Sequence, residues 1–259
     1  MKKIISALIA LISTFATLHI HASETNHAIP QVTDEWRTSI TPYLWLTNVG
    51  GSVSYGDTKL ASVDYNARDL LANLNIAGML TLEAHHGNLG AMADLVYSKL
   101  TYQKSEVLGQ PALSSNTTAE QGIYTFAATY TLHNTKDVYI DGLAGVRVMN
   151  VVTRTDLKVV DPQFGASNSL AKSSTAPIAG VKGRVRLGDS DYFIPFYLDV
   201  GGLGQDTVVT TQQMIGVGHA YEWGDATIGL KNLYNRQKAD GFTTTQSLFG
   251  VVAGLSFKF

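Results

Sequence analysis

The chain ends on Phe249-Gly-Val-Val-Ala-Gly-Leu-Ser-Phe-Lys-Phe259, a stretch in which apolar side chains recur at every second position. Successive side chains of a β-strand point to opposite faces, so this period of two predicts a strand with one apolar and one small or polar face. The apolar face holds Phe249, Val251, Ala253, Leu255, Phe257 and Phe259, and the other face holds Gly250, Gly254, Ser256 and Lys258. The end of the chain therefore predicts an amphipathic strand.

The same alternation recurs in Leu89–Ser98, Gly122–Leu132 and Ala179–Leu187. Soluble sandwiches also contain such strands, but two further features favour a membrane barrel. Aromatic residues lie toward the strand ends, as the interfacial girdles of a transmembrane barrel require. The candidates at one rim are Trp36, Tyr192, Tyr221, Trp223 and Phe259.

The lengths of the connections are the second feature. Short turns are predicted at 86–88, 134–137, 188–191 and 224–225, and longer polar stretches, near 104–120, 155–174, 203–212 and 237–246, alternate with them. Outer-membrane barrels have short turns on the periplasmic side and longer loops outside. The sequence therefore predicts an all-β fold, a transmembrane up-and-down antiparallel barrel.

Counting back from the C-terminus gives about ten strands, with eight or twelve as alternatives. The predicted segments are 245–259, 225–237, 212–223, 191–203, 174–188, 138–154, 119–133, 89–103, 76–86 and 36–48. The interval 49–75 becomes the first external excursion, with a small hairpin at Gly51–Val63 and a short helix at Ala67–Leu74. If that hairpin entered the wall, the count would be twelve.

Composition excludes several classes of protein. Only 15% of the 259 residues are charged, against about 25% in soluble domains. A net charge of −2 argues against a nucleic-acid partner. Because the chain has no cysteine, it has no disulfide, thiolate metal site or cysteine-linked lipid anchor. No cofactor is predicted.

The first residues predict an export signal. Lys2 and Lys3 precede an apolar stretch from Ile4 to Leu18, and small residues that suit cleavage follow within His19–Ser23. A run of 15 residues is short for a membrane-spanning helix, which needs roughly 20. We therefore expect a cleaved signal peptide over 1–22, a periplasmic lead-in over 23–35 and a barrel over 36–259.

The C-terminus resembles the insertion signal read by the bacterial barrel-assembly machinery. Gly254, Phe257 and Phe259 match its glycine, its hydrophobic residue two positions from the end and its terminal aromatic residue, whereas Val252 stands where a polar residue is commoner. The predicted barrel region resembles the small outer-membrane barrels of the opacity/OmpA type found in Gram-negative bacteria. The resemblance implies a location in the outer membrane of the cell envelope, with membrane lipid and the assembly machinery as partners. It implies no reaction.

Charged residues share the parity opposite to the aromatic face, which predicts that they line the lumen. They are Arg37, Glu83, Asp94, Asp141, Arg147, Lys182, Arg184, Arg186, Asp199, Glu222 and Lys231. An Arg or Lys on the lipid face would cost roughly 2–4 kcal/mol at the midplane. Two interpretations remain: an interior network of ion pairs that fills the bore, or a basic lining that selects anions in a narrow porin-like channel. The network is favoured at ten strands, because eight strands are just filled by side chains.

Catalytic motifs are sparse. His219 is the one mid-strand histidine, and its parity predicts a polar residue of the interfacial girdle on the lipid side. His85 and His86 precede a short turn without a third metal ligand nearby, so we interpret them as turn residues. We therefore predict no enzyme, no catalytic residue and no metal site. The predicted function is a structural or surface-loop role. A narrow diffusion channel for small solutes is the first alternative, and a lipid-modifying hydrolase is the second.

Overall fold

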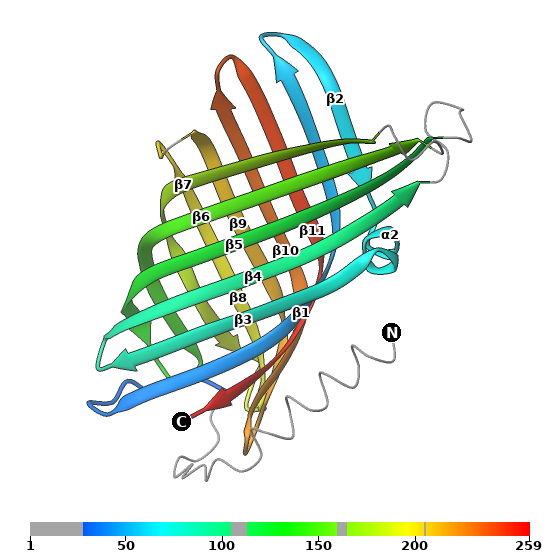
Figure 1. The fold of residues 1–259 in the computed structure, drawn as a ribbon. Coiled ribbons are helices and arrows are strands. Elements are labelled where there is room, and N and C mark those ends of the chain that lie inside the picture. Colours follow the sequence, from blue (N-terminus) through cyan, green and yellow to red (C-terminus); the bar gives the residue numbers. More distant parts are fainter. Residues whose placement is uncertain (1–27, 105–112, 160–164, 205) are drawn as a thin grey trace.

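A computed structural model describes residues 28–104, 113–159, 165–204 and 206–259, and shows a β-barrel (Figure 1). The described elements are β1 (Trp36–Tyr55), β2 (Thr58–Tyr65), α2 (Ala67–Ala72), β3 (Leu74–His86), β4 (Leu89–Lys104), β5 (Leu113–Asn134), β6 (Val138–Val159), β7 (Gly165–Arg186), β8 (Tyr192–Gly202), β9 (Thr207–Tyr221), β10 (Gly224–Ala239) and β11 (Phe242–Lys258). No helix in these ranges is long and apolar enough to cross a membrane.

The sheet closes on itself through β1 and β11, which pair antiparallel from Ser39↔Lys258 to Tyr55↔Phe242. The described strands form an 11-stranded sheet in which β1 and β3 to β11 make the ring, while β2 pairs only with β1. Closure leaves no sheet edge on most of the wall, as a bilayer demands. The predicted antiparallel barrel of about ten strands is confirmed.

The excursion predicted over 49–75 is present as a hairpin and a helix. β1 continues to Tyr55, turns at Gly56 with φ +52°, and pairs with β2. The helix α2 begins after Asn66, whose side chain accepts a hydrogen bond from the Asp69 amide at 3.0 Å. Asparagine is a favoured N-cap, which explains why the helix begins at this residue.

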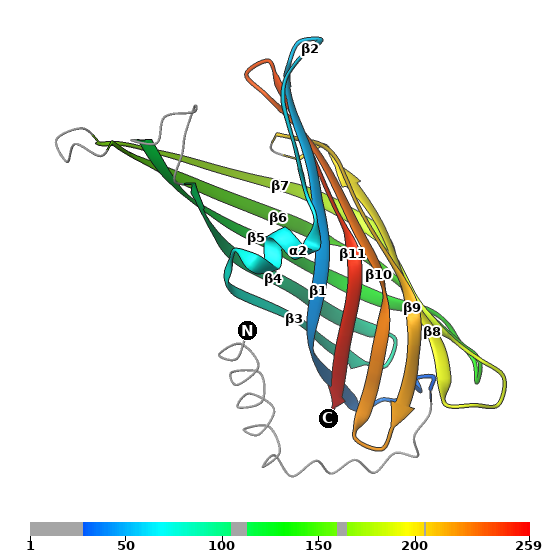
Figure 2. The ribbon, with the colours of Figure 1, turned by 90° about the vertical axis from the view of Figure 1, so that its right-hand side faces the viewer.

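The long polar stretches were predicted as loops, and the structure corrects this. β5, β6 and β7 have 22 residues each, so most of 104–120 and 155–174 is strand in continuous register, for example Thr118↔Arg154 and Thr155↔Asn168. Only Asp240 and Gly241 separate β10 from β11. Threonine has a high strand propensity, and the ladder continues wherever a neighbouring strand is available. Figure 2 shows the far ends of β5 to β7 splaying away from the β1–β2 hairpin.

The outer surface carries an apolar belt bounded by aromatic rings. On β4 the outward positions run from Leu89 to Tyr97, and Lys99 then pairs with Glu120 of β5 at 2.9 Å. Nine residues suit a transmembrane strand, so this ion pair lies just beyond the belt. The hydrogen bond that Glu120 accepts from Lys99 lowers the pKa of the Glu120 carboxyl below its ordinary value.

A ladder of rings lines the belt at the end where β1 begins and β11 ends, which we call the termini end. His219 packs between Tyr192 and Tyr221 with ring centroids 4.5 and 4.4 Å away. Trp223 stacks on Tyr221 at 5.4 Å and contacts Phe257 at 5.6 Å. This arrangement matches the predicted girdle and places His219 within it.

Candidate functional site in the lumen

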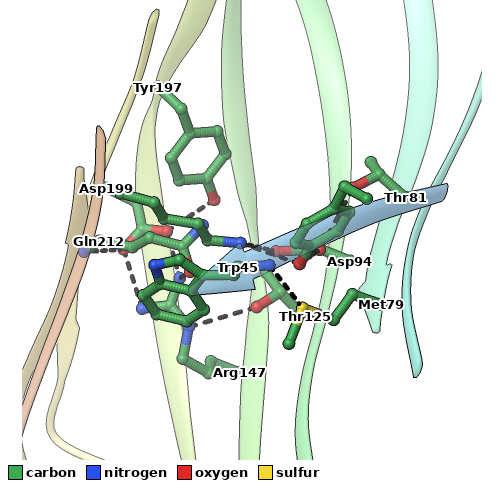
Figure 3. Close-up of polar contacts among 11 residues, drawn as sticks. Trp45, Met79, Thr81, Asp94, Thr125, Arg147, Tyr197, Asp199 and Gln212 are labelled. Atoms are coloured by element: carbon green, nitrogen blue, oxygen red, sulfur yellow. Dashed lines mark hydrogen bonds and ion pairs between the residues drawn. The ribbon is translucent and has the colours of Figure 1, made fainter. Parts of the chain in front are cut away.

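A buried ion pair between Arg147 of β6 and Asp199 of β8 lies at the centre of the lumen (Figure 3). Arg147 and Asp199 are each 1% exposed. The guanidinium donates from Nη1 to Asp199 Oδ1 at 3.0 Å, and Nη2 donates to Oδ2. It also donates to the hydroxyls of Thr125 and Thr210 at 3.2 and 3.1 Å. A planar guanidinium suits such bidentate recognition of a carboxylate.

The remaining acceptor positions of Asp199 are also used. The Tyr197 hydroxyl donates to Oδ2 at 2.6 Å, and the backbone amide of Gln212 donates to Oδ1 at 3.1 Å. Buried charges are tolerated when they are both paired and hydrogen-bonded. The pair and its partners therefore form a satisfied polar cross-brace from β5 to β9.

A second ion pair joins Lys231 of β10 to Asp94 of β4, with Nζ 2.9 Å from Oδ2. The Tyr43 hydroxyl donates to Asp94 Oδ1 at 2.6 Å and accepts from Lys231 at 3.0 Å. Lys231 Nζ also lies 5.0 Å from the centre of the Trp45 ring, a cation–π distance. We call the Arg147–Asp199 and Lys231–Asp94 pairs with their hydrogen-bond partners the ion-pair layer.

An apolar layer covers the ion-pair layer on the side away from the termini. Its members are Trp45, Val96, Ile123, Met149, Leu233 and Leu248. All six are buried, and five of them lie two residues beyond an ion-pair-layer residue on the same strand, as Met149 does relative to Arg147. Because residues two apart in a strand share a face, the apolar layer sits directly on the ion-pair layer.

The strand that pairs with β1 changes beside the apolar layer. β1 pairs with β3 only as far as Pro42 and with β2 only from Val49, so on this side the described strands leave the residues between them unpaired. There the Trp45 amide donates to the Met79 sulfur at 3.1 Å (Figure 3). Proline has no amide hydrogen to donate, which suits the point where the two strands part.

Further charges line the lumen closer to the termini. Lys182 pairs with Glu83 at 2.5 Å, and Asp225 accepts from both Arg184 and Lys258, at 2.8 and 2.7 Å. His85 lies 3.2 Å from Asp141, which also accepts from Thr131 at 2.8 Å. These contacts join strands that are far apart in the sequence.

The predicted lumen residues differ in the partners that the structure gives them. Three ion pairs join predicted residues to one another: Arg147–Asp199, Lys231–Asp94 and Lys182–Glu83. Asp141 and Arg184 instead pair with residues that were not predicted, and Arg186 donates from Nε to the Ser190 carbonyl at 2.8 Å. Arg37 borders the cavity described below.

Glu222 and three other residues require corrections. Glu222 was predicted on a strand, but it is exposed in the turn between β9 and β10. Asp225 was assigned to that turn and instead is a fully buried residue of β10. His85 was interpreted as a turn residue, yet it is a buried residue of β3, and Lys258 was overlooked as a lumen cation. Strand parity could have identified all three, since Asp225 shares the parity of Lys231, His85 that of Glu83, and Lys258 that of Ser256.

A cavity of about 470 Å³ lies between the ion-pair layer and the termini end. The segment 28–34 runs across its mouth: Arg184 donates to the Ala28 carbonyl at 3.3 Å, Asn134 to the Pro30 carbonyl at 2.7 Å, and the Gly87 amide to the Thr33 carbonyl at 2.9 Å. Within the predicted lead-in 23–35, residues 23–27 and the whole of 1–22 lie outside the described residues.

The residues of the predicted assembly signal lie on the seam between β1 and β11. Gly254 is opposite Tyr43, and Phe257 faces outward against Trp223. Phe259 exchanges backbone hydrogen bonds with Thr38 at 2.9 and 3.0 Å, and the residue is 45% exposed. The final aromatic residue is therefore part of the closing ladder and of the outer surface.

Histidines of the described ranges all lie near the termini end: His85, His86, His133 and His219. Within those same ranges no group of three or more His, Asp or Glu residues could hold a metal ion. His219 contacts aromatic rings rather than a hydroxyl nucleophile.

Comparison with known proteins gives structural likeness only. No protein-family model and no curated protein sequence matches the chain. The outer-membrane protease OmpT from Escherichia coli has a similar structure, with a TM-score of 0.53 at 11% identity over 92% of this chain and 99% of that one. Ail of Yersinia pestis has a TM-score of 0.34 at 12% identity over 87% and 100%, and the toluene transporter TodX of Pseudomonas putida 0.33 at 10% over 87% and 90%.

The likeness to the protease shows a shared barrel fold and nothing of its activity. Together with the apolar belt on the outer surface, this fold identifies a bacterial outer-membrane β-barrel. The predicted fold and location are thereby confirmed.

Proposed function

We propose that the protein is a non-enzymatic outer-membrane barrel with a closed lumen, a structural role and a surface role for its long strand ends. The termini end faces the periplasm, as both termini and the short turns do in such barrels. The observation that carries the proposal is that the ion-pair layer and the apolar layer lie in succession across the bore.

Large side chains support the closure in a barrel of this size. Interiors of eight-stranded barrels are just filled by side chains, so ten strands need larger ones. Arg147, Tyr197, Tyr43 and Trp45 all point inward and are buried. Hydrogen bonds hold the side chains of Arg147, Tyr197 and Tyr43 across the bore, whereas a conducting pore needs polar groups around open water.

The surface role rests on β5, β6 and β7. Their outer ends continue the ladder beyond the Lys99–Glu120 pair and are rich in Ser, Thr and Asn. Paired strands give a more rigid surface than loops of the same composition. The location of the described histidines near the periplasmic end supports a non-enzymatic role, because outer-membrane hydrolases place their Ser and His at the outer rim.

Conductance of the refolded barrel in planar bilayers tests the closed lumen. The unmodified protein should show no steady current, after heat-dependent mobility in SDS has shown that it is folded. Leu233→Ala with Leu248→Ala opens only the apolar layer, and Arg147→Ala with Asp199→Ala opens only the ion-pair layer. Each double variant should stay silent, because the other layer remains, whereas the variant with all four changes should conduct.

Removing Arg147 and Asp199 together avoids leaving one buried charge unpaired. Arg186→Ala serves as a control, since this guanidinium donates to Ser190 beside the periplasmic turn rather than crossing the bore. A large, steady, anion-selective current through the unmodified protein would contradict the closed lumen and favour the narrow channel for small solutes.

We also propose that Gly254, Phe257 and Phe259 act as the signal for the barrel-assembly machinery. Phe259 supports this because the residue is exposed while its backbone closes the seam with Thr38. Phe259→Asp should lower the membrane-inserted yield in cells and leave protein in the periplasm. Phe242→Asp, on the outer end of the same strand, is the matched control, and equal yields for both would exclude the role of Phe259.

A further inference from the structure

The wall between β1 and β3 has a section that the described strands do not close. β1 pairs with β3 up to Pro42↔Leu80 and with β2 from Val49↔Tyr65, so the residues of β1 between these pairs have no described strand beside them on this side. Figures 1 and 2 show β1 turning away from β3 toward β2 along this section. Lipid offers no hydrogen-bond partner to a backbone group, so an unpaired stretch is unfavourable wherever it contacts the bilayer.

We call the section between residues 43–48 of β1 and residues 74–79 of β3 the lateral opening. On its β3 side, Ile76, Ala77 and Gly78 are all exposed. A Cβ atom added at Gly78 would meet no heavy atom within 4 Å apart from its chain neighbours. Successive residues of a strand point to opposite faces, so the exposure of consecutive residues indicates a strand without a neighbour on this side among the described residues.

The sequences of both strands nevertheless continue the pattern of the wall across the lateral opening. Extending the β1–β3 register beyond Pro42↔Leu80 pairs outward positions with outward ones and inward positions with inward ones. The next pairs are Tyr43↔Met79, Leu44↔Gly78, Trp45↔Ala77 and Leu46↔Ile76. Leu44 and Leu46 already belong to the apolar belt, with exposed fractions of 46% and 45%, and Ile76 would join them. Neither stretch contains a proline or a charged residue, so the ladder can continue.

The two sides of the lateral opening are joined by a contact that is easily exchanged. The Trp45 amide donates to the Met79 sulfur at 3.1 Å rather than to a backbone carbonyl of β3. A thioether sulfur is a weak acceptor, so a backbone carbonyl can replace it at little cost. The helix α2, which connects β2 to β3, has six residues and no buried side chain. A helix this short is marginal on its own, so it can follow a movement of β3.

We infer that the lateral opening is a gate that admits an acyl chain of the surrounding lipid. In the closed state the ladder continues and pairs the backbone groups of both strands. In the open state the strands part, as they do in the structure, and an acyl chain lies between Leu46 and Ile76. The occupant is an acyl chain because the opening is continuous with the lipid-covered belt and has an apolar rim. Backbone pairing favours the closed state and contacts with the chain favour the open one.

The gate leads to the apolar layer and no further. Trp45 belongs to that layer, and Met79 packs against it. The ion-pair layer stays in place when β1 and β3 part, so the bore remains closed to ions in both states. The gate is therefore a lateral site for lipid, in addition to the closed lumen proposed above.

Disulfide formation tests the closed state, because the chain has no cysteine of its own. Leu46→Cys with Ile76→Cys can be bridged only when the ladder continues, since a disulfide needs Cα atoms within about 7 Å of each other. Ile40→Cys with Leu82→Cys is the matched control, because these residues have the same parity and are opposite each other in the paired part of the two strands. In lipid vesicles with a mild oxidant both disulfides should form, and the one at the lateral opening should form more slowly.

Quenching of tryptophan fluorescence tests the open state in the same protein. Trp36→Phe with Trp223→Phe leaves Trp45 as the only tryptophan. In vesicles of phosphatidylcholine brominated on its acyl chains, reduction of the disulfide between positions 46 and 76 should cause a further loss of Trp45 fluorescence, because a brominated chain can then enter. Reduction of the control disulfide should leave the fluorescence unchanged.

Two outcomes would overturn the gate. If the disulfide between positions 46 and 76 did not form under conditions in which the control disulfide does, β1 and β3 would never close. If Trp45 were quenched equally before and after reduction, no acyl chain would enter. The comparison of the two disulfides needs no tryptophan substitution, so it can reject the gate even if the Trp36 and Trp223 variants do not fold.

Discussion

The two halves of the lumen are lined by the same ten strands, but they bury their polar groups differently. In the middle of the bore, Arg147 and Asp199 are out of contact with water, and each uses most of its hydrogen-bonding capacity within the protein. Toward the termini end, Lys182 and Glu83 form one ion pair beside a cavity, with 12% and 27% of their side chains exposed. We therefore expect the height of a charge along its strand, rather than its facing alone, to determine how much the stability of the fold depends on it.

The strongest test of this comparison breaks one ion pair in each half. Asp199→Ala leaves the Arg147 guanidinium buried without its partner, which should lower the free energy of unfolding by about 3–5 kcal/mol. Glu83→Ala leaves Lys182 beside the cavity, where water can solvate it, and should cost about 1 kcal/mol or less. Urea unfolding in lipid vesicles, followed by tryptophan fluorescence, measures both values.

The two substitutions control for each other, since each removes one carboxylate from an inward-facing ion pair. Equal losses would mean that the cavity is as dry as the ion-pair layer. Recovery of stability on adding Arg147→Ala to Asp199→Ala would identify the unpaired charge, rather than the lost volume, as the source of the cost.

Much of the fold could be predicted from the sequence, because lipid and lumen impose opposite requirements on alternate residues. Within each strand, the alternate positions that face lipid carry apolar or aromatic residues such as Leu89, Phe126 and Tyr130. The positions that face the lumen carry charges such as Asp94 and Arg147. The short helix predicted over Ala67–Leu74 likewise begins at Ala67 in the structure, and it is the only helix in the described part of the chain. These signals are local, so a single sequence contains them.

The partners within the lumen could not be predicted in the same way. Parity places Asp225 inside, but only closure of the ring brings it to Arg184, three strands away in the sheet. Strand ends are also weakly determined, since Ser- and Thr-rich segments such as 165–174 serve either as loops or as extensions of a ladder. For that reason Glu222 was placed on a strand and Asp225 in a turn, a shift of a few residues that exchanges buried and exposed positions.

The apolar layer offers the mildest test of the comparison. The same small change, an isoleucine shortened to valine, is made once in the interior and once on the lipid-facing surface. Ile123 is 3% exposed within the layer, whereas Ile228 is 60% exposed on the outer belt. Ile123→Val should lower the free energy of unfolding by about 0.5–1.5 kcal/mol, since the packed layer cannot close over the lost methylene. Ile228→Val should change it by less than about 0.5 kcal/mol, because lipid chains fill the space that the side chain leaves. Urea titrations of both variants in the same vesicles decide the matter, and an Ile123→Val loss no larger than that of Ile228→Val would mean that the centre of the bore is loosely packed and that its closure depends on the ion pairs alone.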